Sequence, residues 1–300
     1  MKKVVYWSIV AALAGLLFGF DTVVISGADK KLQSLWQSSD SFHGFIVMAM
    51  ALWGTVAGAF IGAVPTQRFG RKKTLFSIGI LYTLSALGSA FANDPYTFAA
   101  FRFIGGLGVG ISTIAAPAYI SEIAPAKHRG RLVGLYQFSL VFGILLAFIS
   151  NFLLSSLGEN AWRWMMGVEA FPAIAFTLLC LGIPESPRWL LSVGKKDQAK
   201  AIFLEIDPNS SFDDVINDLT AIDNNQNKTE SIFDKKYRFP LLLAFYVAFF
   251  NQLSGINAFL YYAPRIFEEG GLGENASLLS SVGIGITNLL FTFVGISLID

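Results

Sequence analysis

The sequence predicts an all-α protein that crosses a membrane several times. Hydrophobic residues make up 54% of its 300 residues and charged residues only 14%, whereas soluble domains carry about 25% charged residues. The mean hydropathy is +0.56. The apolar residues form stretches long enough to cross a hydrocarbon core of about 30 Å. Each stretch must be helical, because lipid offers no hydrogen-bond partner to an open backbone edge.

Eight apolar stretches have the length of a membrane span. We expect them at residues 5–27, 43–64, 74–92, 97–119, 132–154, 164–183, 239–262 and 277–299. The first follows a short basic N-terminus, as in a secretory signal, but it has no small-residue cleavage site and is kept as a span. The N-terminus and the loops after the second, fourth and sixth stretches carry most of the 22 Lys and Arg residues. This excess predicts that they are cytoplasmic.

A polar block at residues 184–238 divides the chain. Residues 1–183 are expected to form an N-terminal six-helix half, and residues 239–300 the first two helices of a second, incomplete half. Within the block, two sets of apolar residues at helical spacing predict short amphipathic helices on the cytoplasmic face. The first set is Ala199, Ile202, Phe203 and Ile206, and the second is Val215, Ile216, Leu219 and Ile222.

Glycines recur within two of the predicted spans. Gly54, Gly58 and Gly62 are spaced by four residues, which lets a second helix approach closely. A nucleotide-binding loop would require a preceding strand, so we interpret the glycines of the fourth span as helix-packing positions too. These are Gly105, Gly106, Gly108 and Gly110.

Three ionisable residues lie inside apolar stretches, namely Asp21, Arg102 and Glu169. Such a group costs free energy unless it is protonated, hydrated or paired, so each is a functional candidate. Burial and a nearby cation act on a carboxyl group in opposite directions, and a residue between the two can load and release a proton. The alternative is a carboxylate that is hydrogen-bonded at a helix interface or lies near the aqueous end of its span.

Other residues that often form reactive or metal sites are few. Cys180 is the only cysteine, which excludes an intramolecular disulfide and a cysteine-based metal site. His43 and His128 lie in or beside predicted loops, and we expect both to be solvated. The sequence has no nucleophile–base pair, histidine-rich metal spacing or cofactor loop, so we do not expect an enzyme. The net charge of +1 argues against a nucleic-acid partner.

Three motifs stand close to cytoplasmic ends of the spans. They are RFGRKK at residues 68–73, PAYISEIAPAKHRG at 117–130 and PESPRW at 184–189. Prolines halt helices and fix where a charge emerges, and arginine pairs bidentately with carboxylates. We expect a latch between helix ends that opens when the helices rock apart. The usual excess of Lys and Arg in cytoplasmic loops would explain the basic residues, but it would not explain Glu122, Glu185 and the recurring prolines.

These motifs, with GFDTVVISG at residues 19–27 and NQLSGINAFLYYAP at 251–264, resemble the sugar porter family of the major facilitator superfamily. The resemblance covers the whole chain in order, and the combination of PESPRW with QLSGIN is highly specific. It implies the major facilitator fold, in which two six-helix halves rock about a midplane site. About eight of twelve expected membrane helices are then present, so the chain is expected to be a truncated or interrupted carrier.

The resemblance implies a role for each group of residues. Proton coupling falls on Asp21, Arg102 and Glu169. Amide side chains suit sugar hydroxyls because they both donate and accept hydrogen bonds, although a buried amide may instead bridge helices. Sugar contacts fall on Phe18, Gln137, Asn251, Gln252, Asn257, Tyr261 and Asn288. The cytoplasmic gate falls on Arg68, Gly70, Arg71, Glu122, Arg129, Glu185 and Arg188.

The implied function is proton-coupled uptake of a monosaccharide, a hexose or a pentose, by alternating access. The protein would be a monomer in the cell membrane, the inner membrane in a bacterium, with the proton as coupling ion and no cofactor or metal. Alternatives are facilitated diffusion, a non-transporting sugar sensor, an inactive fragment and an exporter of amphipathic drugs. Asp21 favours symport, because related facilitators tend to have a neutral residue there. Gln67 stands where the family has an aspartate, which predicts a weaker latch after the second span.

Overall fold

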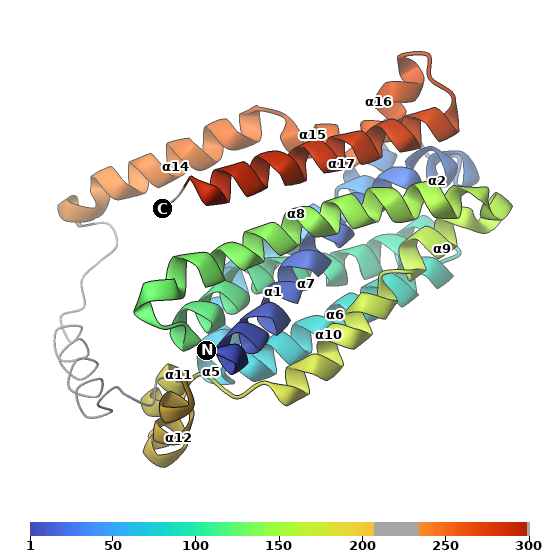
Figure 1. Cartoon of the computed structure of the whole chain (residues 1–300). Coiled ribbons are helices and arrows are strands. Elements are labelled where there is room, and N and C mark those ends of the chain that lie inside the picture. The colour runs from blue at the N-terminus through green and yellow to red at the C-terminus, as the bar shows by residue number, and fades with distance from the viewer. Residues whose placement is uncertain (207–233, 299–300) are drawn as a thin grey trace.

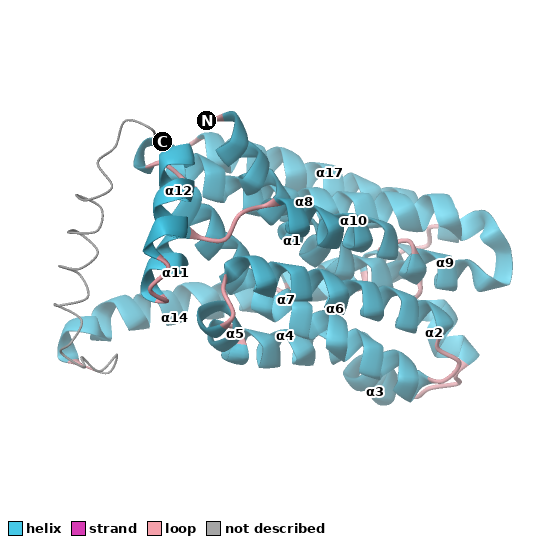
Figure 2. Cartoon of the chain, turned by 90° about the horizontal axis from the view of Figure 1, so that it is seen from below, coloured by secondary structure: helices cyan, strands magenta, loops and turns pink. Residues whose placement is uncertain are grey.

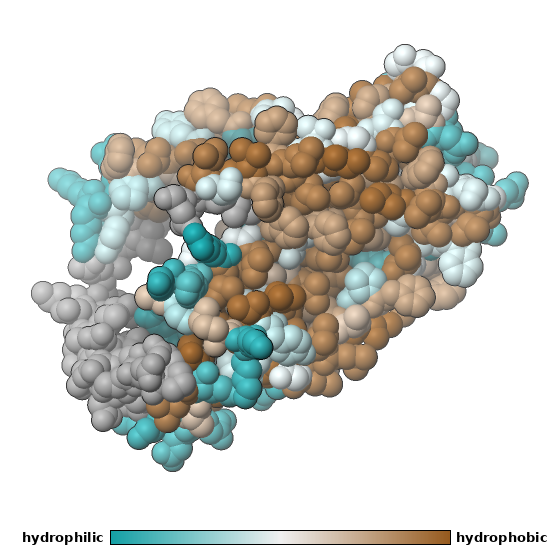
Figure 3. Space-filling view, in the orientation of Figure 1, coloured by the Kyte–Doolittle hydropathy of each residue, from teal (hydrophilic) through white to brown (hydrophobic). Residues whose placement is uncertain are grey.

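The computed structural model describes residues 1–206 and 234–298, and all regular secondary structure within these ranges is helical. The long helices run side by side along one direction (Figure 1). On the face shown in Figure 3, hydrophobic residues cover the middle, and hydrophilic residues gather toward the two ends of the helices. This is the distribution of a bundle that crosses a bilayer.

Seven helical stretches of the described residues are long and apolar enough to span a membrane. The fifth, Ala126–Gly182, has 57 residues and turns back at η4 (Ser155–Asn160), where Gly158 has φ +80°. It therefore supplies two of the eight predicted spans, and these run in opposite directions in Figure 1 as α8 (Arg129–Leu154) and α10 (Ala170–Gly182). All eight predicted stretches are helical over most of their described length.

Residues 1–183 contain six long helices joined by short ones. The second span begins with α3 and continues through a π-helix, η2, before α4, and α9 leads into the sixth. The long helices are α1 (Lys2–Val24), α4 (Met50–Ile61), α6 (Arg71–Phe91), α7 (Pro95–Ile123), α8 (Arg129–Leu154) and α10 (Ala170–Gly182). The short ones are η1 (Ile25–Gly27), α2 (Asp29–Leu35), α3 (Asp40–Phe42), η2 (His43–Met48), α5 (Ala63–Arg68), η3 (Ala126–His128) and α9 (Ala161–Gly167).

Glycines bring two pairs of these helices into backbone contact. A Cβ on Gly106 of α7 would lie 2.9 Å from the Cα of Gly54 on α4, and one on Gly110 would lie 2.7 Å from the carbonyl carbon of Gly58. On the other side of the bundle, a Cβ on Gly19 of α1 would overlap the Leu140 carbonyl oxygen of α8. The prediction that the glycines of the second and fourth spans are helix-packing positions is therefore confirmed.

The polar block begins with α11 (Pro187–Ser192) and α12 (Lys196–Ile206), which lie at the end of the bundle that holds the N-terminus (Figure 2). The first predicted amphipathic set belongs to α12, where Ala199 and Ile206 are buried. An ion pair between Lys3 and Glu205 connects α12 to the start of α1. The second set, Val215 to Ile222, lies outside the described residues.

The seventh span is broken in its middle. α14 (Arg238–Leu253) ends before Gly255, which has φ +76°, and α15 (Ile256–Tyr261) and α16 (Ala263–Glu269) follow. Every residue of α14 is exposed, whereas Leu260, Tyr261 and residues 263–264 are buried at the other end. α17 (Glu274–Ser297) then returns antiparallel to α8 (Figure 1). The segment after the polar block thus meets residues 1–183 at one end of the bundle and stands apart from them at the end near α11 and α12.

Candidate functional site

Asp21 and Arg102 form a buried ion pair between α1 and α7. The Arg102 Nη1 atom donates to the Asp21 Oδ1 atom at 2.5 Å, and Nη2 donates to the Asp21 backbone carbonyl oxygen at 2.7 Å. Each residue is 1% exposed. The sequence placed both residues inside apolar stretches, and the structure brings them together over 81 residues of chain.

Glu169 completes this buried charged cluster from the junction of α9 and α10. It is 1% exposed, and its charge acts on both Asp21 and Arg102. The Asp21 Oδ2 and Glu169 Oε1 atoms have no hydrogen-bond partner among the described residues. The cluster thus holds two carboxyl groups against one guanidinium, and a single proton would balance its charge.

Hydroxyl groups that the sequence reasoning missed surround this cluster. Tyr82, Ser85 and Ser89 are buried on α6, and their hydroxyl groups have no partner among the described residues. A Cβ on Gly105 would touch the Ser85 side chain and lie 3.2 Å from the Asp21 Oδ1 atom, so Gly105 lets these groups come close. The spacing of the three hydroxyl residues along one helix face was the available signal, because it repeats every three to four positions in an otherwise apolar span.

The predicted sugar contacts of the seventh span lie on both sides of its break. Asn251 and Gln252 belong to α14, and Asn257 and Tyr261 belong to α15. The Asn257 Nδ2 atom donates to the Gln252 Oε1 atom at 2.7 Å across the Gly255 turn. Discontinuous helices of this kind form substrate sites in transporters.

Tyr261 connects the predicted sugar site with the charged cluster. It is 4% exposed, and its helix α15 packs against α1, which carries Asp21. The resemblance predicts that Asp21 faces Arg102, but not that the helix of Tyr261 packs against the helix of Asp21.

The remaining predicted sugar contacts lie on three helices around the open end. Phe18 of α1 is half-buried, and Gln137 of α8 is exposed. Asn288 is half-buried on α17, one turn after Gly285, whose Cβ would lie 3.1 Å from the Leu145 Cα atom of α8. The two amides therefore lie on neighbouring antiparallel helices.

The three predicted gate motifs meet in a compact network at the ends of α6, α7 and α11. The Glu185 Oε1 atom accepts the backbone N–H groups of Arg71 and Lys72 at 2.9 and 3.0 Å. The Arg71 Nη2 atom donates to the Glu122 Oε1 atom at 2.8 Å, and the Ser186 hydroxyl donates to the Glu122 Oε2 atom at 2.5 Å. A carboxylate at the first N–H groups of α6 is also favoured by the helix dipole.

Gly70 is required by this network. Its φ is +94°, and a Cβ there would lie 2.9 Å from the carboxyl carbon of Glu185. The Trp189 indole adds a hydrogen bond to the Gln67 carbonyl oxygen at 2.6 Å. Position 67 thus contributes through its backbone, whichever side chain it carries.

Three predicted gate residues lie outside this network. Arg68 stands 5.7 Å from the centroid of the Phe69 ring. The side chains of Arg129 and Arg188 form no ion pair or hydrogen bond with any part of the chain that the structure describes. The network also connects only elements of residues 1–206, so here it ties one half together.

The expectation that His43 is solvated is wrong. His43 is 2% exposed, and its Nε2 atom lies 2.7 Å from the Asp29 Oδ1 atom. The π-helix η2 begins at His43 and brings it toward α2. Single-sequence reasoning missed this pair because its two members are 14 residues apart, on either side of a loop.

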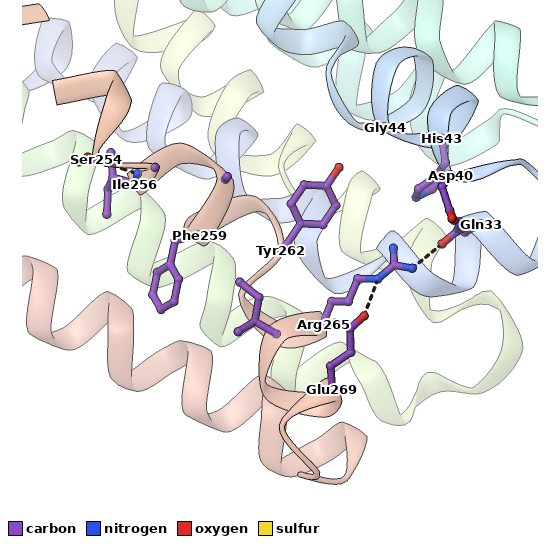
Figure 4. A pocket seen from close by; sticks show the side chains of 13 residues that line it. Gln33, Asp40, His43, Gly44, Ser254, Ile256, Phe259, Tyr262, Arg265 and Glu269 are labelled. Carbon is purple, nitrogen blue, oxygen red and sulfur yellow. Dashed lines mark hydrogen bonds and ion pairs between the residues drawn. The ribbon is translucent and has the colours of Figure 1, made fainter. Parts of the chain in front are cut away.

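A cavity of about 800 Å³ opens beside this pair, between η2 and the α15–α16 segment. Figure 4 shows His43, Asp40 and Gln33 on one side and Tyr262, Arg265 and Glu269 on the other. In the described residues, no group of three or more His, Cys, Asp or Glu side chains could hold a metal ion.

Comparison with known proteins places the chain in a family. The family model described as sugar (and other) transporter matches residues 7–300. The D-xylose-proton symporter of Escherichia coli (strain K12) is 34% identical over 325 residues, covering 98% of this chain and 66% of that protein. The arabinose-proton symporter of Bacillus subtilis is also 34% identical, covering 100% of this chain and 66% of the relative. The chain therefore spans slightly less than two thirds of the length of these relatives.

Solved structures show the same fold. The proton:xylose symporter XylE bound to 6-bromo-6-deoxy-D-glucose matches with a TM-score of 0.89 and 32% identity, covering 100% of this chain and 70% of that one. The partially occluded inward-open form of XylE from E. coli matches with a TM-score of 0.86 and 32% identity, covering 99% and 73%. The broken seventh helix and the buried charge cluster thus stand in a recognised transporter fold, and the chain belongs to the sugar transporter family of the major facilitator superfamily.

Proposed function

We propose that the protein carries a monosaccharide into the cell together with a proton, by alternating access. The observation that carries this proposal is the position of Tyr261. It is buried on the predicted sugar-binding helix α15, which packs against α1, the helix that carries Asp21. A change of protonation in the buried cluster is therefore sensed by the helix that contacts the sugar.

Charge balance supports one proton per cycle. With Asp21 and Glu169 both ionised, the cluster has one negative charge in excess of Arg102, and an unbalanced charge is costly in a buried site. Protonation of Asp21 frees it from Arg102 and permits the inward swing. The ion pair of this structure corresponds to the state after the proton has left.

The positions of α14, α15 and α16 support an inward-facing state. Residues 1–183 form the N-terminal half, residues 239–300 the first two helices of the C-terminal half, and residues 184–238 the cytoplasmic connection. The halves meet through α15, α16 and the packing of α17 on α8, whereas α14 stands away from α8 (Figure 1). With a cytoplasmic N-terminus, the open end faces the cytoplasm, where Gln137, Asn251 and Gln252 are reached by a sugar.

Uptake measurements test the proposal. Radiolabelled xylose, arabinose and glucose would be offered to proteoliposomes of the protein, with and without an imposed inward proton gradient. We expect accumulation above equilibrium only with the gradient. Asp21→Asn should abolish accumulation while sugar exchange at equal concentrations persists. Asp197→Asn, an exposed carboxylate on α12, serves as the matched control and should accumulate normally.

Other outcomes identify the alternatives. If sugar equilibrates at the same rate with and without the gradient, the protein is a facilitator and Asp21 is structural. If accumulation survives Asp21→Asn, the coupling site lies elsewhere. Sugar binding without any transport would favour a sensor.

A further inference from the structure

A second buried ionic cluster lies at the outer end of the bundle, away from Asp21 and Arg102. Asp29 of α2 is 1% exposed and His43 of η2 is 2% exposed. The Asp29 carboxylate contacts His43 at 2.7 Å on one side and the Arg265 Nη1 atom at 3.3 Å on the other. The Ser38 hydroxyl lies 3.4 Å from the other ring nitrogen of His43.

Arg265 comes from α16, in the segment after the polar block. Its Nη2 atom donates to the Gln33 Oε1 atom at 2.8 Å, and its Nε atom donates to the Glu269 Oε1 atom at 3.3 Å (Figure 4). Burial lowers the pKa of Arg265, but the carboxylates of Asp29 and Glu269 outweigh burial and raise it. The residue is therefore a permanent cation, held between a carboxylate of its own helix and one of α2.

Arg265 joins α16 to α2 at the end of the bundle where the two halves are in contact. α15 and α16 pack against η1, and the ion pairs of Arg265 and Glu268 join α16 to α2. Opening of the outer side must move α16 away from α2, and this movement separates Arg265 from Asp29. The buried part of that contact is then exposed to water.

We propose that Asp29 and Arg265 form an external lock that stabilises the state closed to the outside, and that His43 positions Asp29. When Arg265 leaves, His43 remains bonded to Asp29, so the carboxylate keeps a partner. The lock can therefore open and close repeatedly while the Asp29 carboxylate keeps a hydrogen-bond partner. The assignment of this end to the outside rests on the proposed function. The lock itself concerns only the equilibrium between the conformation in which α16 contacts α2 and the one in which it has moved away.

The chain supplies its own matched control. Lys30 and Glu268 form a second ion pair between α2 and α16, at 2.5 Å, but the Lys30 side chain is 44% exposed. Exposed pairs contribute little because water and salt screen them. Both pairs join the same two helices, so they differ chiefly in burial.

The test measures a distance rather than transport. Spin labels at Leu35→Cys and Leu272→Cys, both exposed, in a Cys180→Ser background, report the separation of the two halves at the outer end by double electron–electron resonance in proteoliposomes. We expect Asp29→Asn and Arg265→Gln each to raise the ratio of long to short distances about tenfold, because hydrogen bonds to charged groups contribute this much or more. Lys30→Gln should change the ratio less than threefold.

The double variant separates a lock from general loosening. If the two residues act on each other, Asp29→Asn combined with Arg265→Gln changes the ratio no more than the larger single substitution. Full additivity would overturn the proposal, as would an effect of Lys30→Gln equal to that of Asp29→Asn. Arg265→Gln alters a partly exposed side chain, so it keeps the test valid should Asp29→Asn fold poorly. A failure of proton coupling would leave these distances unchanged and is therefore distinguishable.

Discussion

Arg102 donates its hydrogen bonds to Asp21, and Glu169 lies beside this pair without an ion pair to Arg102 in the described part of the chain. Substitution of Glu169 should therefore affect coupling less than substitution of Asp21. An amide at position 169 keeps the shape of the side chain and can donate to Asp21 without a bound proton. Asp21 would then be the only titratable group of the cluster.

We expect Glu169→Gln to lower proton-driven accumulation severalfold without abolishing it, whereas Asp21→Asn abolishes it. The measurement is the steady-state ratio of sugar inside and outside proteoliposomes under a fixed proton gradient. Equal exchange rates for both variants would show that sugar binding is intact. A complete loss of accumulation in Glu169→Gln would place the coupling proton on Glu169 instead.

Asp94 offers a residue-scale prediction about stability and pH. It precedes α7 and accepts hydrogen bonds from the Thr97 hydroxyl at 2.6 Å and from the Thr97 and Tyr96 N–H groups at 2.9 and 3.0 Å. These hydrogen bonds, that of the Thr97 side chain foremost, lower the pKa of Asp94 below 3.8. A lowered carboxyl pKa in the folded state stabilises the fold above the unfolded pKa, and this contribution is lost as the pH falls through the folded pKa.

Asp94→Ala should therefore lower the thermal unfolding temperature in detergent at pH 7, and the difference from the wild type should shrink below about pH 4. Asp94→Asn keeps an acceptor for the backbone N–H groups and is the matched control, with a smaller loss at pH 7. A difference for Asp94→Ala that stays constant from pH 7 to pH 3 would contradict the argument.

At the scale of elements, the α4–α7 interface depends on glycine. Gly106→Ala places a Cβ 2.9 Å from the Gly54 Cα atom and against the Ala51 carbonyl oxygen, so the two helices must move apart. Overpacking of this kind costs about 1–3 kcal/mol. Gly130 of α8 has nothing within 4 Å of its would-be Cβ, and Gly130→Ala should be neutral or stabilise by up to about 1 kcal/mol. Thermal unfolding of the two variants side by side tests this, and equal behaviour would refute close packing of α4 on α7.

The sequence predicts an element well when the interaction that forms it acts on many residues, and poorly when it depends on one or two. Hydropathy locates the spans because lipid acts on every residue of a span alike. The break at Gly255 and the π-helix η2 depend on single backbone conformations, and an apolar count does not register them. The Asp21–Arg102 pair could be proposed because an ionisable residue is conspicuous in an apolar run. The Asp29–His43 contact could not, because polar residues beside a loop are ordinary.

The same reasoning explains why some predicted gate residues form contacts with one another and others do not. Arg71, Glu122 and Glu185 stand at helix ends where unpaired N–H groups and charges need partners, so their motifs predict a contact. Arg68, Arg129 and Arg188 carry the same charge as Arg71 but are exposed to solvent. Sequence spacing does not tell a paired arginine from a solvated one.

At the scale of the whole molecule, the two ends of the bundle differ in access. Gln137 is exposed at the open end, while Leu260 and Tyr261 are buried at the closed end. A cysteine at position 137, in a Cys180→Ser background, should react with a membrane-impermeant thiol reagent at least tenfold faster from the cytoplasmic side than from outside. Asp29→Asn should reduce the ratio of these two labelling rates by increasing the rate of reaction from outside. Equal rates from both sides in the otherwise unaltered protein would contradict an inward-facing resting state.

The buried charge cluster and most of the predicted sugar-binding amides lie on opposite sides of the polar block. Asp21, Arg102 and Glu169 all precede it, whereas Asn251, Gln252 and Asn257 follow it, and we propose that Tyr261 couples the two sets. The energy source and the cargo preference of such a carrier are therefore separable traits. In a chimera that joins this N-terminal half to the C-terminal half of a relative, we expect the N-terminal half to determine the coupling ion. The C-terminal half should largely determine the sugar specificity.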